Sequence, residues 1–515
     1  MQRIARYKFI LLLGMVLGFA SCDKDFEALN VNPNASEKPN IDLLFTQSLL
    51  KGSLPLDRAY FFTSYLHCGT YIQHYAIAKE MAGSGAGDKY AVNDFYQSFY
   101  YRNVYTNTMT TLAEIIEAAQ GPENVNKLAV ARLWKALLMQ RITDLYGDVP
   151  YSEATRGKYN LFQPKYDPQE DIYAALLKDV EEAIKSFDAA KPTFGNADLI
   201  YKGNIAQWKK FGYSLMLRMA MRTTRATSTK VVAKDWALKA VAGGVITEGT
   251  DNAVVRYSNG PQTYNNNPIA FELVNQDYVP SSKGASNQEW GKFSKTFIDF
   301  LKNHNDPRLG VVSVVWTNGS PDTAAALQKG MANGTDVKPA NPASYSEPNP
   351  ATILNYASPL LVMTNAEMNL LLSEVALRGW SSGDKAQLYA NGVTAALRNW
   401  SLFGAAGTIA PERIIQYVAD NALNTGGSFE AQMEQIHTQF WAALLLDEQE
   451  AYANWRRTGY PVLVPVKYTG NATGGTIPRR LPYSQTEQGI NGVNYNDAVK
   501  RQGPDVLTTR MWWDK

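Results

Sequence analysis

Cysteine and histidine are scarce in this chain, whose 515 residues include two cysteines and four histidines. Two cysteines cannot build the dense disulfide framework of small secreted domains, so the fold must depend on a hydrophobic core. His67 and His74 are seven residues apart and could share a helix face. Two histidines and one cysteine do not make a zinc site at the usual ligand spacings. We therefore expect no metal centre built from these residues.

An excess of charge of one sign is also lacking. Lysine and arginine number 50 against 48 aspartates and glutamates, a formal net charge of +2, and basic residues gather only in short pairs such as Arg456-Arg457 and Arg479-Arg480. A nucleic-acid-binding protein normally carries a basic stripe, so nucleic acid is not predicted as a partner. The apolar fraction of 45% excludes wholesale disorder. At about 150 residues per domain the length suggests three units, although one large domain is also allowed.

The amino-terminal hydrophobic run is too short to span a bilayer. It extends from Phe9 to Ala20 and follows the cations Arg3, Arg6 and Lys8. A spanning helix needs about 20 apolar residues, whereas the core of a signal peptide needs about 7–15. Residues 1–21 are therefore predicted to be a signal peptide.

The residues around Cys22 predict lipidation. Phe19-Ala20-Ser21-Cys22 resembles the bacterial lipobox, in which the cysteine is acylated, although Phe19 stands where leucine is usual. The acidic residues after Cys22 resemble the surface-export signal of Bacteroidota-type lipoproteins. The alternative is an ordinary small-residue cleavage site with Cys22 as a bystander. On the first interpretation residues 22–40 form a lipidated tether, and Cys68 is a buried, inert thiol.

Helical periodicity dominates the rest of the chain. Apolar residues recur at helical spacing from Lys127 to Tyr146, with Gly147 and Pro150 as stop signals. Start signals precede two further helices, at Asp167-Pro168-Gln169-Glu170 and Thr364-Asn365-Ala366-Glu367. The other predicted helices run from Ile205 to Arg222, Lys385 to Trp400 and Phe429 to Trp455. We expect a mainly α fold of stacked, tetratricopeptide-like helix pairs, although no clean 34-residue repeat aligns.

Two long stretches between the predicted helices have a different composition. Residues 251–289 and 316–360 are rich in Asn, Gly, Pro and Ser, and short strand candidates such as Val311 to Trp316 interrupt the helical pattern. Loops of this length inside a compact domain are usually functional or disordered. The helical scaffold is therefore expected to carry a large, irregular, loop-rich face and a few short strands.

Four segments in order carry a family resemblance. They are the ALNVNPNAS opening after the lipobox, RITDLYGDVPYSEA (Arg141 to Ala154), GNIAQWKKFGYSLMLRMAMR (Gly203 to Arg222), and RRLPYSQTEQ followed by TTRMWWDK (Arg479 to Lys515). Together they resemble the SusD/RagB family, in its SusD-like branch. The resemblance implies one α-helical domain over residues 41–515. It also implies a surface lipoprotein of the outer membrane that captures oligosaccharides, or in some branches peptides, for a SusC-like TonB-dependent transporter.

Ligand candidates are sought on the loops, because a sugar needs a flat aromatic ring for its C–H face and polar groups for its hydroxyls. Trp134, Trp208, Trp512 and Trp513 lie on periodic or terminal segments and are interpreted as packing residues. The alternative for every candidate is that its ring fills the core beneath the loops. The candidates are Trp290, Tyr264, Tyr278, Asn266, Tyr75 and Tyr90.

Catalysis has little support in the sequence. The chain contains no H-E-x-x-H or P-loop motif. Glycoside hydrolysis needs only two carboxylates at a suitable separation, so a surface glycosidase stays open as a less favoured alternative. A purely structural lid for the transporter also stays open. We expect a binding protein without enzymatic activity or cofactor; loop Asp and Asn oxygens leave a bound calcium ion open.

Overall fold

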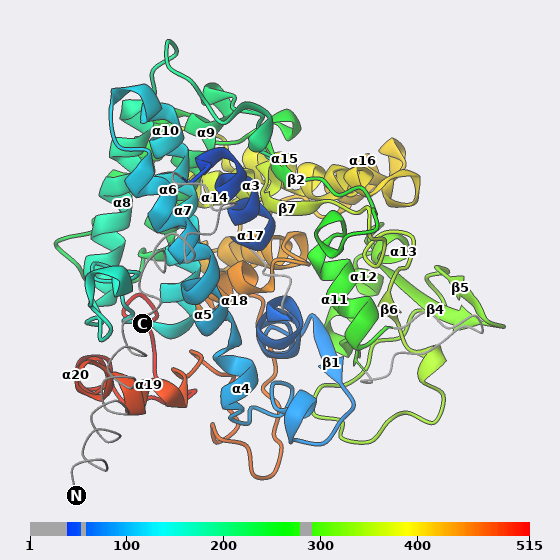
Figure 1. Cartoon of the computed structure of the whole chain (residues 1–515). Coiled ribbons are helices and arrows are strands. Elements are labelled where there is room, and N and C mark those ends of the chain that lie inside the picture. The colour runs from blue at the N-terminus through cyan, green and yellow to red at the C-terminus, as the bar shows by residue number, and fades with distance from the viewer. Residues whose placement is uncertain (1–38, 53–57, 279–290) are drawn as a thin grey trace, which may run out of the picture. The chain divides into compact units, whose positions relative to one another are not determined.

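Helices account for most of the chain in the computed structural model, which describes residues 39–52, 58–278 and 291–515 (Figure 1). Residues 41–515 form one compact unit. The signal peptide, Cys22 and nearly all of the predicted tether lie outside the described residues, as does Trp290. The α-helices are α3 (Ile41–Gly52), α4 (Asp94–Gln97), α5 (Phe99–Asn103), α6 (Thr110–Ala118), α7 (Val125–Tyr146), α8 (Gln169–Ser186), α9 (Ile205–Arg222), α10 (Ala233–Gly243), α11 (Pro268–Gln276), α12 (Lys295–Asn303), α13 (Leu309–Val312), α14 (Asn365–Leu377), α15 (Lys385–Arg398), α16 (Pro411–Asp420), α17 (Phe429–Ala443), α18 (Glu448–Thr458), α19 (Gln485–Ile490) and α20 (Gly492–Gln502).

Consecutive helices pack in pairs, as predicted from the periodicity. The pairs are α7 with α8, α9 with α10, α14 with α15, and α17 with α18. Helix α8 also packs on α9, and α14 packs on α17, so the pairs are stacked (Figure 1). A π-helix at Tyr60–Gly69 is buried along its whole length and packs against α18 and α11. The mainly α fold class with tetratricopeptide-like helix pairs is confirmed.

The strands are short and lie in the segments that interrupt the helix pairs. Among the described residues four antiparallel pairings form three small sheets: β1 with β3, β2 with β7, and β4 with both β5 and β6. The pairing of β4 with β5 is a local hairpin, and the other three join segments farther apart in the chain. The strands are β1 (Tyr75–Ile77), β2 (Ala253–Val255), β3 (Gly291–Phe293), β4 (Ser313–Thr317), β5 (Ser320–Asp322), β6 (Glu347–Pro348) and β7 (Leu360–Met363). The long polar stretches of the sequence therefore contain real strands, and they contain helix α11 as well.

Two predicted helix features, the extent of one helix and the capping residue of another, are wrong. The segment from Phe429 to Trp455 is not one helix, because the chain turns after α17 and Leu446 adopts a left-handed φ of 82° before α18 begins. Asp167 does not cap α8. Its carboxylate instead accepts hydrogen bonds from the backbone N–H groups of Tyr151 and Ser152. Sequence periodicity and residue spacing predict neither the left-handed backbone of Leu446 nor the contact of the Asp167 carboxylate with a distant loop.

A buried network of ion pairs ties the stacked helices together. Arg218 of α9 donates two hydrogen bonds of 2.6 Å to Glu367 of α14. Arg222 of α9 bonds to Glu450 of α18 and, at 3.2 Å, to Asp144 of α7. Two further pairs have the same character: Arg141 with Asp447, and Arg457 with Glu374. His437, whose pKa is lowered by burial, lies 3.0 Å from Glu374. Because a buried charge is costly unless it is paired, this network fixes the relative position of the helices.

Candidate functional site

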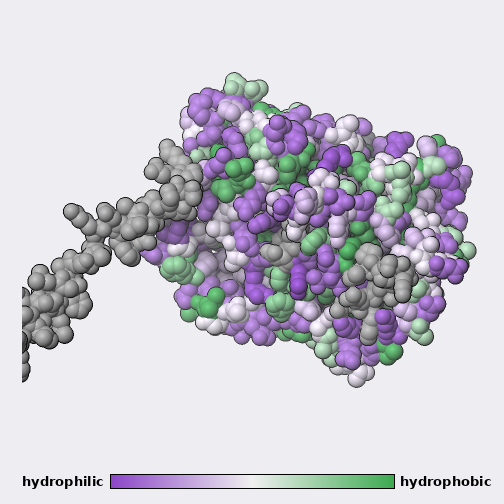
Figure 2. All heavy atoms as spheres, turned by 45° about the vertical axis from the view of Figure 1, so that its right-hand side comes forward, coloured by the Kyte–Doolittle hydropathy of each residue, from purple (hydrophilic) through white to green (hydrophobic). Residues whose placement is uncertain are grey.

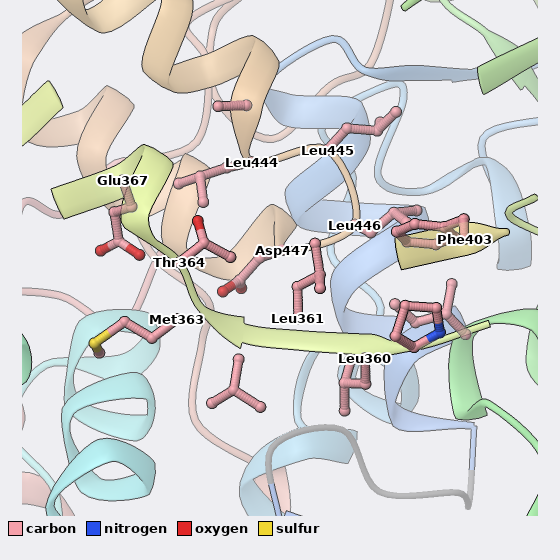
Figure 3. Close-up of a pocket in the computed structure, with 14 residues that line it drawn as sticks. Leu360, Leu361, Met363, Thr364, Glu367, Phe403, Leu444, Leu445, Leu446 and Asp447 are labelled. Atoms are coloured by element: carbon pink, nitrogen blue, oxygen red, sulfur yellow. The ribbon is translucent and has the colours of Figure 1, made fainter. Parts of the chain in front are cut away.

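A small internal gap lies between β7, the start of α14 and the turn that joins α17 to α18. Figure 3 shows Leu444, Leu445 and Leu446 of that turn on one side and the strand residues on the other. Its volume of about 30 Å³ is enough for one or two water molecules. It is therefore too small for a sugar ring, and we look for the ligand site on the surface.

Three loops that are distant in sequence meet on one surface, which we call the loop face. It comprises residues 79–91, 329–345 and 464–475, together with Trp316 of β4. The buried ion pair of Lys89 and Asp88 holds the first two loops together, with 3.0 Å between Nζ and Oδ2. Lys89 also donates to the carbonyl oxygens of Ile77 and Thr335, both at 2.8 Å. Asp88 accepts from the Asn333 side chain at 2.6 Å, so all polar groups of the pair have partners.

Tyr90 joins the third loop to the first. Its hydroxyl accepts a hydrogen bond from the Val466 N–H at 3.1 Å, and its carbonyl accepts one from Ala472 at 2.9 Å. The backbone of Tyr90 has a positive φ of 56°, a conformation that costs free energy for a residue with a side chain. The surrounding contacts maintain that conformation, and the three loops are thereby held as one surface.

Three partly exposed rings are carried by the loop face. Tyr468 donates a hydrogen bond of 2.9 Å to Asp336, and the Lys329 ammonium lies 4.3 Å from the ring centroid of Tyr345. The third ring, Trp316, belongs to β4, the strand in which Val314 pairs with Glu347 of β6. On the other side of β4, Trp316 pairs with Pro321 of β5. All three residues are partly exposed, and each ring has a polar neighbour that restricts its orientation.

A buried charge pair fixes the indole of Trp316. Its N–H donates to Glu347, which also forms an ion pair with Lys292 of β3. Burial raises the pKa of Glu347, while the Lys292 ammonium and the hydrogen bonds counter that effect. The hydrogen bond from the indole N–H to Glu347 orients the ring of Trp316, a partly exposed residue. Figure 2 shows that the molecular surface turned toward the viewer mixes hydrophilic and hydrophobic residues without one continuous apolar patch.

The residues predicted from the sequence lie mostly elsewhere. The exposed fraction is at most 3% for three of them, Tyr75, Tyr90 and Tyr278. Tyr75 stacks on Phe293 with 5.3 Å between ring centroids, and the Tyr278 hydroxyl lies 2.7 Å from that of Tyr65. These three rings pack in the interior, which was the alternative interpretation, and do not offer a face to a ligand in this structure. Tyr90 belongs to the loop face as a support.

The second group of candidates flanks the start of α11. Tyr264 is 52% exposed, so its ring is accessible. Asn266 is buried, and its side-chain oxygen has no hydrogen-bond partner among the described residues. Trp290 is outside the described residues, and its predicted role stays a prediction. Sequence reasoning did not select Trp316, Tyr345 or Tyr468, because a tyrosine or tryptophan on a loop carries no signal of its depth.

Comparisons with known proteins agree with the resemblance. The family model SusD-like_2, described as "Starch-binding associating with outer membrane", matches residues 37–484. A solved structure titled "chitin-binding protein" is 32% identical, with a TM-score of 0.79, and the match covers 92% of this chain and 100% of that one. A SusD homologue from Bacteroides uniformis is 25% identical, with a TM-score of 0.77, over 93% of this chain and 100% of its own.

A third solved structure shares the fold. A chitin-binding SusD homologue from Flavobacterium johnsoniae is 24% identical, with a TM-score of 0.76, and the match covers 93% of this chain and 99% of that one. Among curated proteins, none matches this chain. Within the described part of the chain, no helix is long and apolar enough to cross a membrane.

Proposed function

Because this chain belongs to the SusD-like family of starch-binding, outer-membrane-associated proteins, we propose that it captures oligosaccharides at its loop face and does not cleave them. The observation that carries the proposal is the set of partly exposed rings, Trp316, Tyr345 and Tyr468, held on a rigid support. An aromatic face with fixed polar neighbours suits the C–H face and the hydroxyl rim of a sugar ring. The 32% identical chitin-binding relative makes a chitin oligosaccharide the first ligand to test.

The proposed binding role extends to delivery. The family resemblance supports a lipid-anchored protein that faces the cell exterior and passes its glycan to a SusC-like TonB-dependent transporter. The absence of catalysis is also part of the proposal. Glu448 is the carboxyl group with a pKa raised to about 7, a value typical of a general acid, but the residue is fully buried and cannot meet a substrate in this structure.

Calorimetry with the purified protein tests the proposal. Chitohexaose, maltoheptaose and a pool of mixed peptides are titrated separately, and we expect binding of at least one glycan. Tyr468→Ala is expected to weaken that binding about tenfold, equivalent to about 1.4 kcal/mol, because the aromatic face that packs on the sugar is lost. Tyr159→Ala is the matched control, because Tyr159 is 60% exposed and lies outside the loop face, where it bonds to Glu117.

Three outcomes would contradict the proposal. Binding of the peptide pool alone would identify a peptide-binding member of the family. An unchanged isotherm for Tyr468→Ala, Tyr345→Ala and Trp316→Ala would remove the loop face as the site. If chromatography detects shorter sugars released from the glycan, the protein is an enzyme and the non-catalytic role is refuted.

A further inference from the structure

A second concavity lies at the carboxyl end of the chain, away from the loop face in sequence and sharing no residue with it. It has a volume of about 450 Å³ and is formed by the start of α8, the end of α20 and residues 510–515. This volume falls in the range of about 300–1,000 Å³ that is usual for small-molecule sites. In Figure 1 the end of the chain, marked C, lies between α8 and α20. We call this concavity the C-terminal pocket.

Trp512 supplies an aromatic wall to the C-terminal pocket. The neighbouring Trp513 is fully buried, whereas Trp512 is only partly buried and lines the pocket. The ring of Trp512 is tilted against Tyr173 of α8, with 5.9 Å between centroids. Its backbone N–H donates to the Gln169 side chain at 3.0 Å. The sequence predicted that both tryptophans are packing residues. Trp513 is only a packing residue, whereas Trp512 also lines the pocket.

Hydrogen bonds fix the polar walls of the pocket. The Asp148 carboxylate accepts from the Gln169 N–H at 2.9 Å and pairs with Arg501 at 3.1 Å. The Gln502 side chain in turn accepts from the Asp148 N–H at 2.7 Å. A pocket whose walls are held by buried hydrogen bonds keeps its shape without a ligand, which lowers the entropic cost of binding.

The charges of the pocket balance. Asp148 pairs with Arg501, and the buried Asp514 pairs with Arg510 at 2.9 Å and with Arg479. Glu170 and Lys515 complete the charged lining, so three acidic residues stand against three basic ones and the lining has no excess of either sign. Carboxylate and guanidinium groups still offer acceptors and donors to hydroxyl groups. The lining thus combines an aromatic face with paired polar groups.

We propose that the C-terminal pocket is a second binding site, which takes a ring of a neutral saccharide with its C–H face on Trp512. The proposal rests on the function proposed above and adds a site to it. A larger hollow, of about 630 Å³, lies between α12, α13 and the start of α16. Its described lining contains no aromatic residue, so it lacks the ring that a sugar needs.

Titration calorimetry of the full chain and its variants tests the second site. Chitohexaose, maltoheptaose and cellohexaose are the neutral probes, and trigalacturonate is the anionic probe. We expect two sites per chain for the glycan that binds, one lost in Tyr468→Ala, the other in Trp512→Ala, and both in the double variant. Arg510→Gln is the second variant, because Arg510 is exposed and Asp514 keeps Arg479 as a partner. We expect it to weaken the second site at least threefold without a change in melting temperature.

The possible failures can be told apart. If Tyr468→Ala removes all binding while Trp512→Ala and Arg510→Gln change nothing, the second site is refuted and the proposed function stands. If the unmodified protein binds none of the neutral probes, both are refuted. If the unmodified protein binds trigalacturonate more tightly than the neutral probes, and Trp512→Ala abolishes that binding, the neutral ligand class is refuted. If Trp512→Ala does not fold, an unchanged isotherm of Arg510→Gln is sufficient to reject the site.

Discussion

Glu448 is a buried carboxyl group that forms no ion pair with the described residues. Its neighbours are the Tyr60 hydroxyl, at 3.2 Å, and the Leu446 N–H, at 3.0 Å, and its second oxygen has no hydrogen-bond partner. Desolvation by burial therefore raises its pKa from 4.5 to about 7. Because the pKa in the folded state is higher than in the unfolded state, the folded protein holds this proton more tightly. Its contribution to stability is complete below pH 4.5 and is lost as the pH rises through about 7.

Replacement of Glu448 by glutamine is expected to change the pH dependence of stability. The amide resembles the protonated carboxyl, so Glu448→Gln is predicted to gain stability relative to the wild type between pH 5 and pH 8. The difference between pKa values of 4.5 and about 7 corresponds to a relative gain of about 3 kcal/mol at most. Urea unfolding of both proteins at several pH values measures it. A stability difference that is the same at pH 5 and pH 8 would contradict the assignment.

The depth of an aromatic ring could not be predicted from the sequence. Tyr75 and Tyr468 are both tyrosines in loop-rich segments, yet Tyr75 is fully buried between Phe293 and Tyr65 and Tyr468 is partly exposed. The difference arises from strand β1, whose partner β3 is more than 200 residues away. Composition correctly indicated loops rich in aromatic residues, but the pairing of distant strands decides which ring reaches the surface.

At the scale of elements, three loops are held as one face by few groups. Lys89, on the first loop, reaches a carbonyl of the second, and Asp88 accepts hydrogen bonds from two residues of the second, Asn333 and Gly334. Nothing in the sequence marked these residues, because a charged pair at adjacent positions usually indicates a solvated loop. Their burial is a consequence of how the loops cover each other.

Loss of the Asp88 carboxylate is predicted to disorganise the loop face. Asp88→Asn leaves the Lys89 ammonium buried without its counter-charge, and breaking a buried pair from one side typically costs about 3–5 kcal/mol. We expect urea unfolding to show a loss in this range and glycan affinity to fall. Asp299→Asn is the matched control, since its pair with Lys295 is exposed and contributes about 1 kcal/mol or less. Equal effects of the two variants would refute the positioning role of Asp88.

Helix positions were predictable where the pattern is local. The predicted helix from Ile205 to Arg222 coincides with α9, and Thr364 is the residue immediately before α14. Both depend on periodicity and on residues within one turn of the helix end. The break at Leu446 was not predictable, because a left-handed leucine is maintained by contacts of the whole fold. Local patterns thus specify the helices, and tertiary contacts specify the turns.

For the whole molecule, the family motifs acquire a physical role in the buried ion-pair network. Arg141 and Asp144 lie in the motif RITDLYGDVPYSEA, and Arg218 and Arg222 lie in the motif of α9. The three arginines pair with Glu367 of α14, with Asp447 immediately before α18 and with Glu450 of α18, and Asp144 pairs with Arg222. Most motif residues therefore belong to the scaffold, and the rings proposed for the loop face lie on segments that no motif covers, whereas Trp512, proposed for the second site, lies within a motif. This explains why the fold was predictable from the sequence and the site was not.

The proposed lipid anchor depends on one cysteine, Cys22, which lies outside the described residues. A single acyl chain binds a membrane only marginally, whereas a multiply acylated cysteine holds the protein firmly. Cys22→Ser is therefore predicted to move the protein from the outer-membrane fraction to the soluble fraction, as measured by fractionation and immunoblotting of cells that express it. Cys68→Ser is the matched control, because Cys68 is the other cysteine of the chain and is fully buried. If Cys22→Ser stays in the membrane fraction after a high-salt wash, the lipid tether is refuted and another contact must hold the protein there.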